Sequence, residues 1–136
     1  MSSGSILFTG GTVVDGLGNA PVRADVLVEA GHIAAVSPSG LTAERTVAID
    51  GMVIAPGFID MHTHSDLQIL CNPDHTSKLS QGVTTEVLGQ DGLSYATVDD
   101  ATLLELRRQL KGWNDDPPGF DWNWRSVAEY LKRLDG

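Results

Sequence analysis

Apolar positions in the first 55 residues come in short runs, separated by glycine, proline and charged residues. Such runs predict short strands, which we place at residues 6–9, 12–14, 24–29, 32–36 and 46–49. Ala30 and Gly31 separate the third run from the fourth, so we predict a tight hairpin there. Because little helical pattern lies between the runs, residues 1–55 are predicted to form a small β domain of the sandwich type.

The hydrophobic pattern then changes. Residues 52–64 hold an apolar run, broken by a Pro-Gly pair, that ends in polar residues. An apolar strand with a polar end is typical of a parallel strand in an α/β barrel. We expect a short helix within residues 74–81 and a second buried strand over residues 83–88.

Two amphipathic helices are predicted to follow that strand. Apolar residues recur three or four positions apart, first at Leu103, Leu106, Leu110 and Trp113, and then at Trp124, Val127, Leu131 and Leu134. Asp99 and Asp100 precede the first helix, where carboxylates can cap free N–H groups. Residues 56–136 are therefore predicted to be the start of a (β/α) barrel domain of the α/β class. A closed eight-stranded barrel takes about 250 residues, so we expect this sequence to be incomplete.

Composition narrows the class of protein. A hydrophobic fraction of 41% with 20% charged residues is typical of a globular chain. The net charge of −9 argues against binding to nucleic acid or to anionic membranes, since both need clustered basic residues. The first residues lack the features of a signal peptide, and a single cysteine, Cys71, cannot form an internal disulfide. These features favour a cytoplasmic location.

His62 and His64 are the candidate chemistry. Residues i and i+2 of a strand point to the same face, so the two imidazoles can share one metal ion. Asp60 lies two residues earlier on that face and could hold a histidine ring from behind. A His-x-His tripeptide alone is weak support, but its place at the end of an apolar strand is where barrel enzymes put their chemistry.

Several segments carry a family resemblance. Ala-Pro-Gly-Phe-Ile-Asp-Met-His-Thr-His-Ser-Asp at residues 55–66 resembles the first-strand signature of the amidohydrolase superfamily, and residues 11–16 and 24–36 resemble its β-sandwich lead-in. Residues 81–89 and 124–131 resemble one branch, the N-acyl-D-amino-acid deacylases or D-aminoacylases.

The resemblance implies a ligand set. His62 and His64 would bind the more buried metal, and a bridging ligand would follow the second strand. That ligand is a cysteine in the deacylase branch, whereas Asp91 stands at the matching position here. A carboxylate is a competent ligand for zinc or manganese. The alternative is that Asp91 only shapes a turn between glycines. Cys71 precedes the second strand and is out of register.

The resemblance also implies an activity. We expect metal-assisted hydrolysis of a small-molecule amide, with an N-acyl-D-amino acid as substrate and zinc as cofactor. The remaining ligands and the general base, an aspartate in this family, would lie beyond Gly136. Two alternatives stay open: a cyclic amidase of the dihydropyrimidinase or hydantoinase kind, and an inactive fragment that at most binds metal.

The other residues that could suggest chemistry have simpler interpretations. We expect His32 to lie in an exposed turn and the three tryptophans to pack. His75 begins a predicted helix. Lys78 precedes the second strand, which is the wrong place for a carbamylated, metal-bridging lysine.

Overall fold

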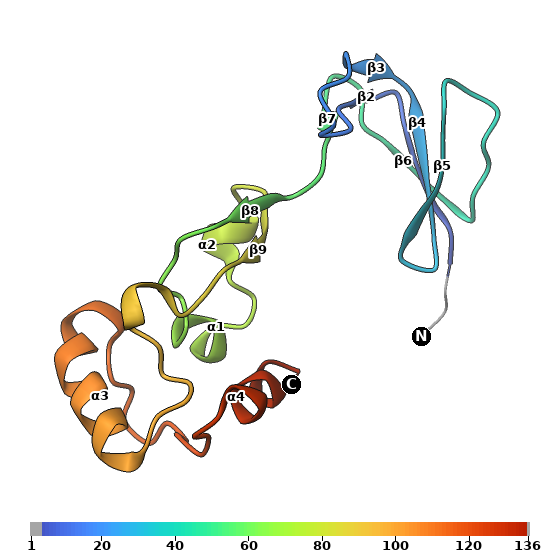
Figure 1. Ribbon diagram of the computed structural model, residues 1–136. Coiled ribbons are helices and arrows are strands. Elements are labelled where there is room, and N and C mark those ends of the chain that lie inside the picture. Colours follow the sequence, from blue (N-terminus) through green and yellow to red (C-terminus); the bar gives the residue numbers. More distant parts are fainter. Residues whose placement is uncertain (1–3, 136) are drawn as a thin grey trace. The chain divides into compact units, whose positions relative to one another are not determined.

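The computed structural model describes residues 4–135 and divides the chain into two compact units, Met1–Pro56 and Gly57–Gly136. Between residues 4 and 56 the regular elements are all strands (Figure 1): β1 Ile6–Thr9, β2 Thr12–Val13, β3 Val22–Arg23, β4 Asp25–Glu29, β5 His32–Ser37, β6 Arg45–Ala48 and β7 Val53–Ile54. They form a four-stranded sheet in the order β5-β4-β1-β6 and a three-stranded sheet in the order β3-β2-β7. The pairs β1–β6 and β2–β7 are parallel, and the others are antiparallel.

The predicted hairpin is confirmed. β4 and β5 pair antiparallel, and the two residues between them, Ala30 and Gly31, have φ angles of 48° and 78°. Two successive left-handed residues give the backbone twist that joins antiparallel strands most tightly. Leu7 and Val26, on neighbouring strands of the same sheet, are buried in the core of this unit.

The apolar run around residue 53 belongs to the first unit and not to the second. Val53 and Ile54 form β7, which pairs in parallel with β2. The strand that follows the Pro-Gly pair is β8, Phe58–Asp60, and it ends sooner than the pattern to residue 64 suggested. The cause is local: Oδ1 of Asp60 accepts a hydrogen bond from the backbone N–H of His62 at 3.2 Å, which turns the chain out of the extended conformation.

The second unit mixes strands and helices (Figure 1): β8, α1 Gln68–Cys71, α2 Thr76–Leu79, β9 Val83–Glu86, η1 Gln90–Gly92, α3 Asp100–Asn114 and α4 Val127–Leu134. β8 and β9 are adjacent and parallel, with Asp60 opposite Glu86. The Thr84 side chain of β9 lies so close to the residue before β8 that a Cβ at Gly57 would be 2.0 Å from its Oγ1, so only glycine fits there.

The expectation of buried strands is wrong for the described residues. Phe58 and Ile59 of β8 are exposed, as are Thr84 and Thr85 of β9. A parallel pair is buried only when further strands or helices cover both of its faces, and within residues 4–135 the pair forms a two-stranded sheet of its own.

Residues of α3 and α4 and of the segments beside the helices form the core of this unit. Asp99 caps α3 as predicted, its side chain accepting from the backbone N–H of Thr102 at 2.7 Å. The second helix was predicted to include Trp124, but α4 starts after Ser126, which forms a capping box with Glu129. Trp124 is almost fully buried before the helix. The predicted apolar stripe was also wrong for α4, because Tyr130 is its buried residue. The buried cluster consists of Leu67, Tyr95, Leu103, Leu110, Trp124 and Tyr130.

No helix within residues 4–135 is long and apolar enough to cross a bilayer.

Candidate metal centre

Both histidines come together, although not by strand alternation. β8 ends at Asp60, and His62 and His64 lie in the irregular segment beyond it. Their ring centroids are 5.4 Å apart, and the ring planes meet at 72°. The imidazoles therefore occupy one side of the segment, as the spacing predicted, but a bend in the backbone places them there.

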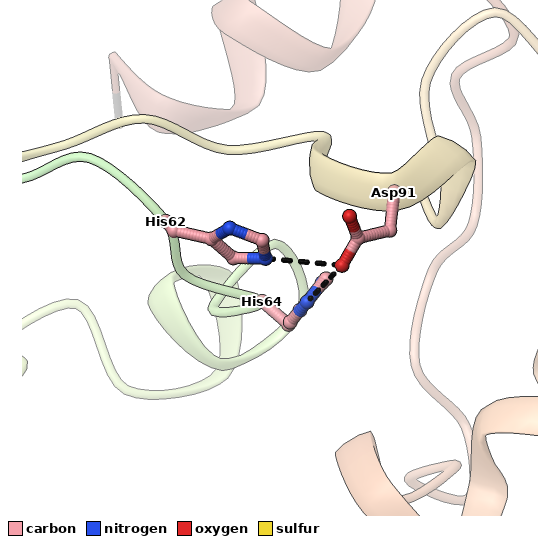
Figure 2. A group of neighbouring side chains, drawn as sticks. All are labelled: His62, His64 and Asp91. Carbon is pink, nitrogen blue, oxygen red and sulfur yellow. Dashed lines mark hydrogen bonds and ion pairs between the residues drawn. The ribbon is translucent and has the colours of Figure 1, made fainter.

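Asp91 completes the group. Its Oδ2 lies 3.0 Å from Nε2 of His62 and 3.4 Å from Nε2 of His64 (Figure 2). The residue belongs to η1, which follows β9, and it has a left-handed φ of 56° between Gly89 (75°) and Gly92 (72°). Aspartate tolerates this conformation better than most residues do, and such backbone strain gathers at functional sites.

The donor set fits a divalent metal. One ring nitrogen of each histidine and a carboxylate oxygen of Asp91 all lie within 4.8 Å of one another. Two ligands about 2.1 Å from a tetrahedral ion are about 3.4 Å apart, close to the separations between the carboxylate and the imidazoles. The His64 side chain is only 14% exposed, whereas those of His62 and Asp91 are each 58% exposed. The group is thus anchored on one side and open on the other, and a metal held there would have room for further ligands.

Within residues 4–135, Asp60 makes no hydrogen bond to a histidine ring. One of its oxygens accepts from the backbone of His62, and the other pairs with the ammonium of Lys78. The hydrogen bond from Lys78 holds the pKa of the Asp60 carboxyl below its ordinary value. With both oxygens occupied, the carboxylate orders the backbone that carries the ligands instead of an imidazole. Nδ1 of His64 is buried, with no partner within the described residues.

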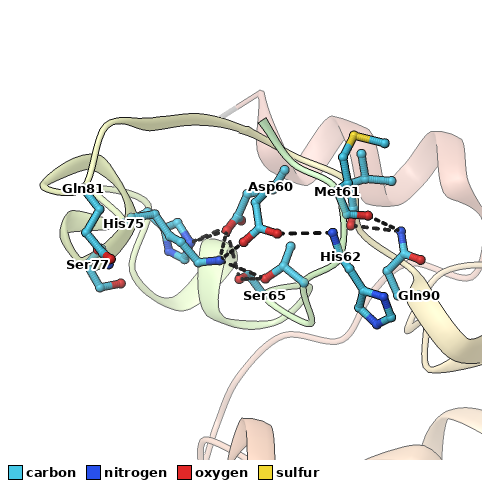
Figure 3. A network of polar contacts seen from close by, with 12 residues as sticks. Asp60, Met61, His62, Ser65, His75, Ser77, Gln81 and Gln90 are labelled. Atoms are coloured by element: carbon cyan, nitrogen blue, oxygen red, sulfur yellow. Dashed lines mark hydrogen bonds and ion pairs between the residues drawn. The ribbon is translucent and has the colours of Figure 1, made fainter. Parts of the chain in front are cut away.

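A polar network behind the histidines was missed by sequence reasoning. Glu86, at the end of β9, has a side chain only 7% exposed, and it contacts Ser65, His75 and Lys78. Figure 3 shows the side chains of Asp60, Ser65 and His75 turned toward one another in this network. A glutamate within the predicted second buried strand was the available signal, since a buried carboxylate needs a partner.

Lys78 remains a cation in this setting. Hydrogen bonds to Asp60 and then Glu86 raise its pKa above the ordinary value. A carbamylated lysine must first be a neutral amine, so the surroundings of Lys78 disfavour that role.

A cavity of about 320 Å³ adjoins the centre. Its lining includes His64, Lys78 and Trp113. The Trp113 ring contacts the His64 ring at a centroid distance of 4.6 Å, yet the residue is 60% exposed. Trp113 thus lies at the surface beside a candidate ligand and not in the helical core.

In sequence, the chain is similar to amidohydrolases. A sequence model described as the amidohydrolase family matches residues 45–136. The chain is 45% identical over 133 residues to a D-aminoacylase of Alcaligenes xylosoxydans xylosoxydans, covering 95% of this chain and 26% of that protein. It is 42% identical over 92 residues to an N-acyl-D-glutamate deacylase of the same organism, covering 67% of this chain and 19% of that protein.

Solved structures of the same kinds of enzyme are also similar to this chain. A D-aminoacylase with a binuclear metal centre superposes with a TM-score of 0.74 at 37% identity, over 95% of this chain and 26% of that one. An N-acyl-D-glutamate deacylase of Bordetella bronchiseptica, complexed with zinc and a phosphonate mimic of the tetrahedral intermediate, superposes with a TM-score of 0.73 at 34% identity. The match covers 96% of this chain and 26% of that one. The chain thus spans about a quarter of the length of these relatives.

Proposed function

Because the chain belongs to the amidohydrolase family, we propose that it supplies metal ligands to a hydrolase that cleaves the amide bond of N-acyl-D-amino acids. The observation that carries the proposal is the convergence of His62, His64 and Asp91 just beyond the carboxyl ends of two parallel strands. Catalytic groups of α/β barrels lie at that end of the strands.

The two units have different parts in this proposal. The all-strand unit corresponds to the small β domain that we predicted for residues 1–55. The parallel pair β8–β9, with its two intervening helices, corresponds to the first units of a (β/α) barrel. Their similarity to D-aminoacylase structures over nearly the whole chain supports both assignments.

The residues have distinct proposed roles. His64 is the more buried ligand and fixes the position of the ion, while His62 and Asp91 hold it from the exposed side. When bound, a divalent metal such as zinc supplies an activated water, with a pKa lowered toward roughly 7, and polarises the amide carbonyl. Asp91 brings a negative charge that offsets the charge of the ion, as a thiolate would. Being a harder ligand than a thiolate, it makes manganese a second candidate metal.

The substrate class rests on similarity to the deacylases. D-Aminoacylase and N-acyl-D-glutamate deacylase share 45% and 42% of the matched residues with this chain. Their names agree on an N-acyl group and a D-configured amino acid, and they differ in the side chain. We therefore propose the shared chemistry, an N-acyl-D-amino acid.

The test is hydrolysis by the intact protein of N-acetyl-D-amino acids and their L-enantiomers, followed by the release of free amine. We expect turnover of D-substrates that a chelator abolishes and added zinc restores. Absence of hydrolysis of every N-acetyl-D-amino acid by metal-loaded protein would rule out the proposed substrate class.

A further inference from the structure

We propose that Lys78 is a positioning residue for the metal centre, holding the segment that carries His62 and His64 in its ligating shape. The inference rests on the proposed function, because it presumes that these histidines bind metal. Lys78 itself touches none of the three proposed ligands, according to the hydrogen bonds and ion pairs of residues 4–135.

Lys78 contacts the ligand segment at two points. Its ammonium pairs with Oδ2 of Asp60, whose other oxygen accepts from the backbone N–H of His62 at 3.2 Å. It also donates to Oγ1 of Thr63 at 3.2 Å. Thr63 lies between the two histidines, so one side chain from α2 restrains the backbone before the first ligand and between the two.

Glu86 anchors the lysine from the other side. Its Oε1 lies 2.9 Å from the ammonium of Lys78 and 3.3 Å from the hydroxyl of Ser65, which bonds to Thr63 at 2.9 Å. The four groups close a ring of contacts between α2, β9 and the ligand segment. Such a ring leaves the segment few alternative conformations, and residues that orient metal ligands in this way affect metal affinity.

The charges explain why a cation is needed. Asp60 and Glu86 occupy paired positions on β8 and β9, and Lys78 binds both carboxylates. Without it the two negative charges would face each other, and Glu86 is almost fully buried. Two neighbouring carboxylates repel and separate unless one takes up a proton. Separation would move Asp60, and with it the backbone N–H of His62.

The proposal predicts a defect in the metal centre beyond any loss of stability. The intact protein is loaded with cobalt(II), whose visible absorption reports ligand geometry, and its affinity for zinc is measured by competition with a chelator. Lys78→Met should weaken zinc binding about 10- to 100-fold and alter the cobalt spectrum. Lys78→Arg, which keeps the cation, should restore much of both.

A matched control and a gentler variant keep the test decisive. Lys111→Met removes an exposed lysine of the same unit that makes no ion pair within residues 4–135, and it should change neither readout. Thr63→Val removes both hydrogen bonds of the Thr63 hydroxyl, to Lys78 and to Ser65, at nearly constant shape, and it should weaken zinc binding several-fold even if Lys78→Met fails to fold.

The outcomes separate the two proposals. Wild-type affinity and an unchanged cobalt spectrum in Lys78→Met, or in Thr63→Val if Lys78→Met does not fold, would overturn the role of Lys78 alone. A wild-type protein that binds no zinc or cobalt would overturn the metal centre itself.

Discussion

Tyr130 ties α4 to the segment that follows the histidines, and its removal makes a sharp test of the packing. Its hydroxyl donates to the backbone carbonyl of Asp66 at 2.6 Å, and both residues are buried. Burial raises the pKa of Tyr130, so the hydroxyl stays a donor at all ordinary pH values. Tyr130→Phe keeps the ring, whose centroid lies 5.7 Å from that of Trp124, and removes only the donor.

The expected cost follows from that geometry. A buried carbonyl that loses its partner costs about 1–3 kcal/mol, whereas the loss of one oxygen leaves almost no cavity. The free energy of unfolding should fall by about that amount. All three tryptophans lie in the unit Gly57–Gly136, so urea unfolding followed by their fluorescence reports on this unit. The midpoint should fall while the m-value stays constant.

Tyr95→Phe is the matched control. Tyr95 is buried as well, and its hydroxyl lies beside the Asn114 side chain but has no partner with good hydrogen-bond geometry within the described residues. Its removal should change the free energy of unfolding by less than about 0.5 kcal/mol. Equal effects of the two substitutions would refute the claim that the Tyr130 hydroxyl stabilises the fold through Asp66.

Three further predictions follow. Trp113 contacts the ring of His64, a proposed ligand, so copper(II) bound there should quench the tryptophan fluorescence. Trp113→Phe should remove most of that quenching, and full quenching in the variant would contradict the contact. Gly57→Ala should destabilise the protein by about 1–3 kcal/mol because its Cβ would overlap Thr84, whereas Gly112→Ala, which meets nothing within 4 Å, should be neutral or stabilising in thermal unfolding. Hydrogen bonds from Arg108 and Gln109 lower the pKa of the Glu105 carboxyl from 4.5 to about 2. The stability that these bonds contribute is therefore present above pH 4.5 and is lost as the pH falls toward 2. Glu105→Gln should make the stability depend less on pH over that window, and an unchanged acid-unfolding profile would contradict the reasoning.

Local signals were enough to predict much of the fold. The Ala30-Gly31 turn and the Asp99 cap each depend on a few neighbouring residues, and both appeared where the pattern placed them. The start of α4 was missed because the apolar pattern reaches back to Trp124, whereas a capping box at Ser126 and Glu129 begins the helix after that residue. Trp124 is instead buried by a contact distant in sequence, its Nε1 donating to the carbonyl of Tyr95. Periodicity carries no information about such a contact.

In the candidate site, too, some residues could be identified from the sequence and others could not. His62 and His64 stand out in the sequence, because two imidazoles at a strand end have no packing role. Lys78 and Glu86 do not, because their value comes from a charge pairing between α2 and β9 that only the tertiary structure creates. The pairing of Asp60 with Lys78 was missed for the same reason: the cation lies eighteen positions away in the sequence.

The central claim is that both imidazoles hold one ion, and metal content tests it most directly. The intact protein and a His62→Ala/His64→Ala variant would be saturated with zinc, desalted and analysed for metal per chain. We predict bound zinc in the wild type and loss of the ion at this site in the double variant, with an unchanged fold by circular dichroism. Equal zinc content in the two proteins would contradict the account.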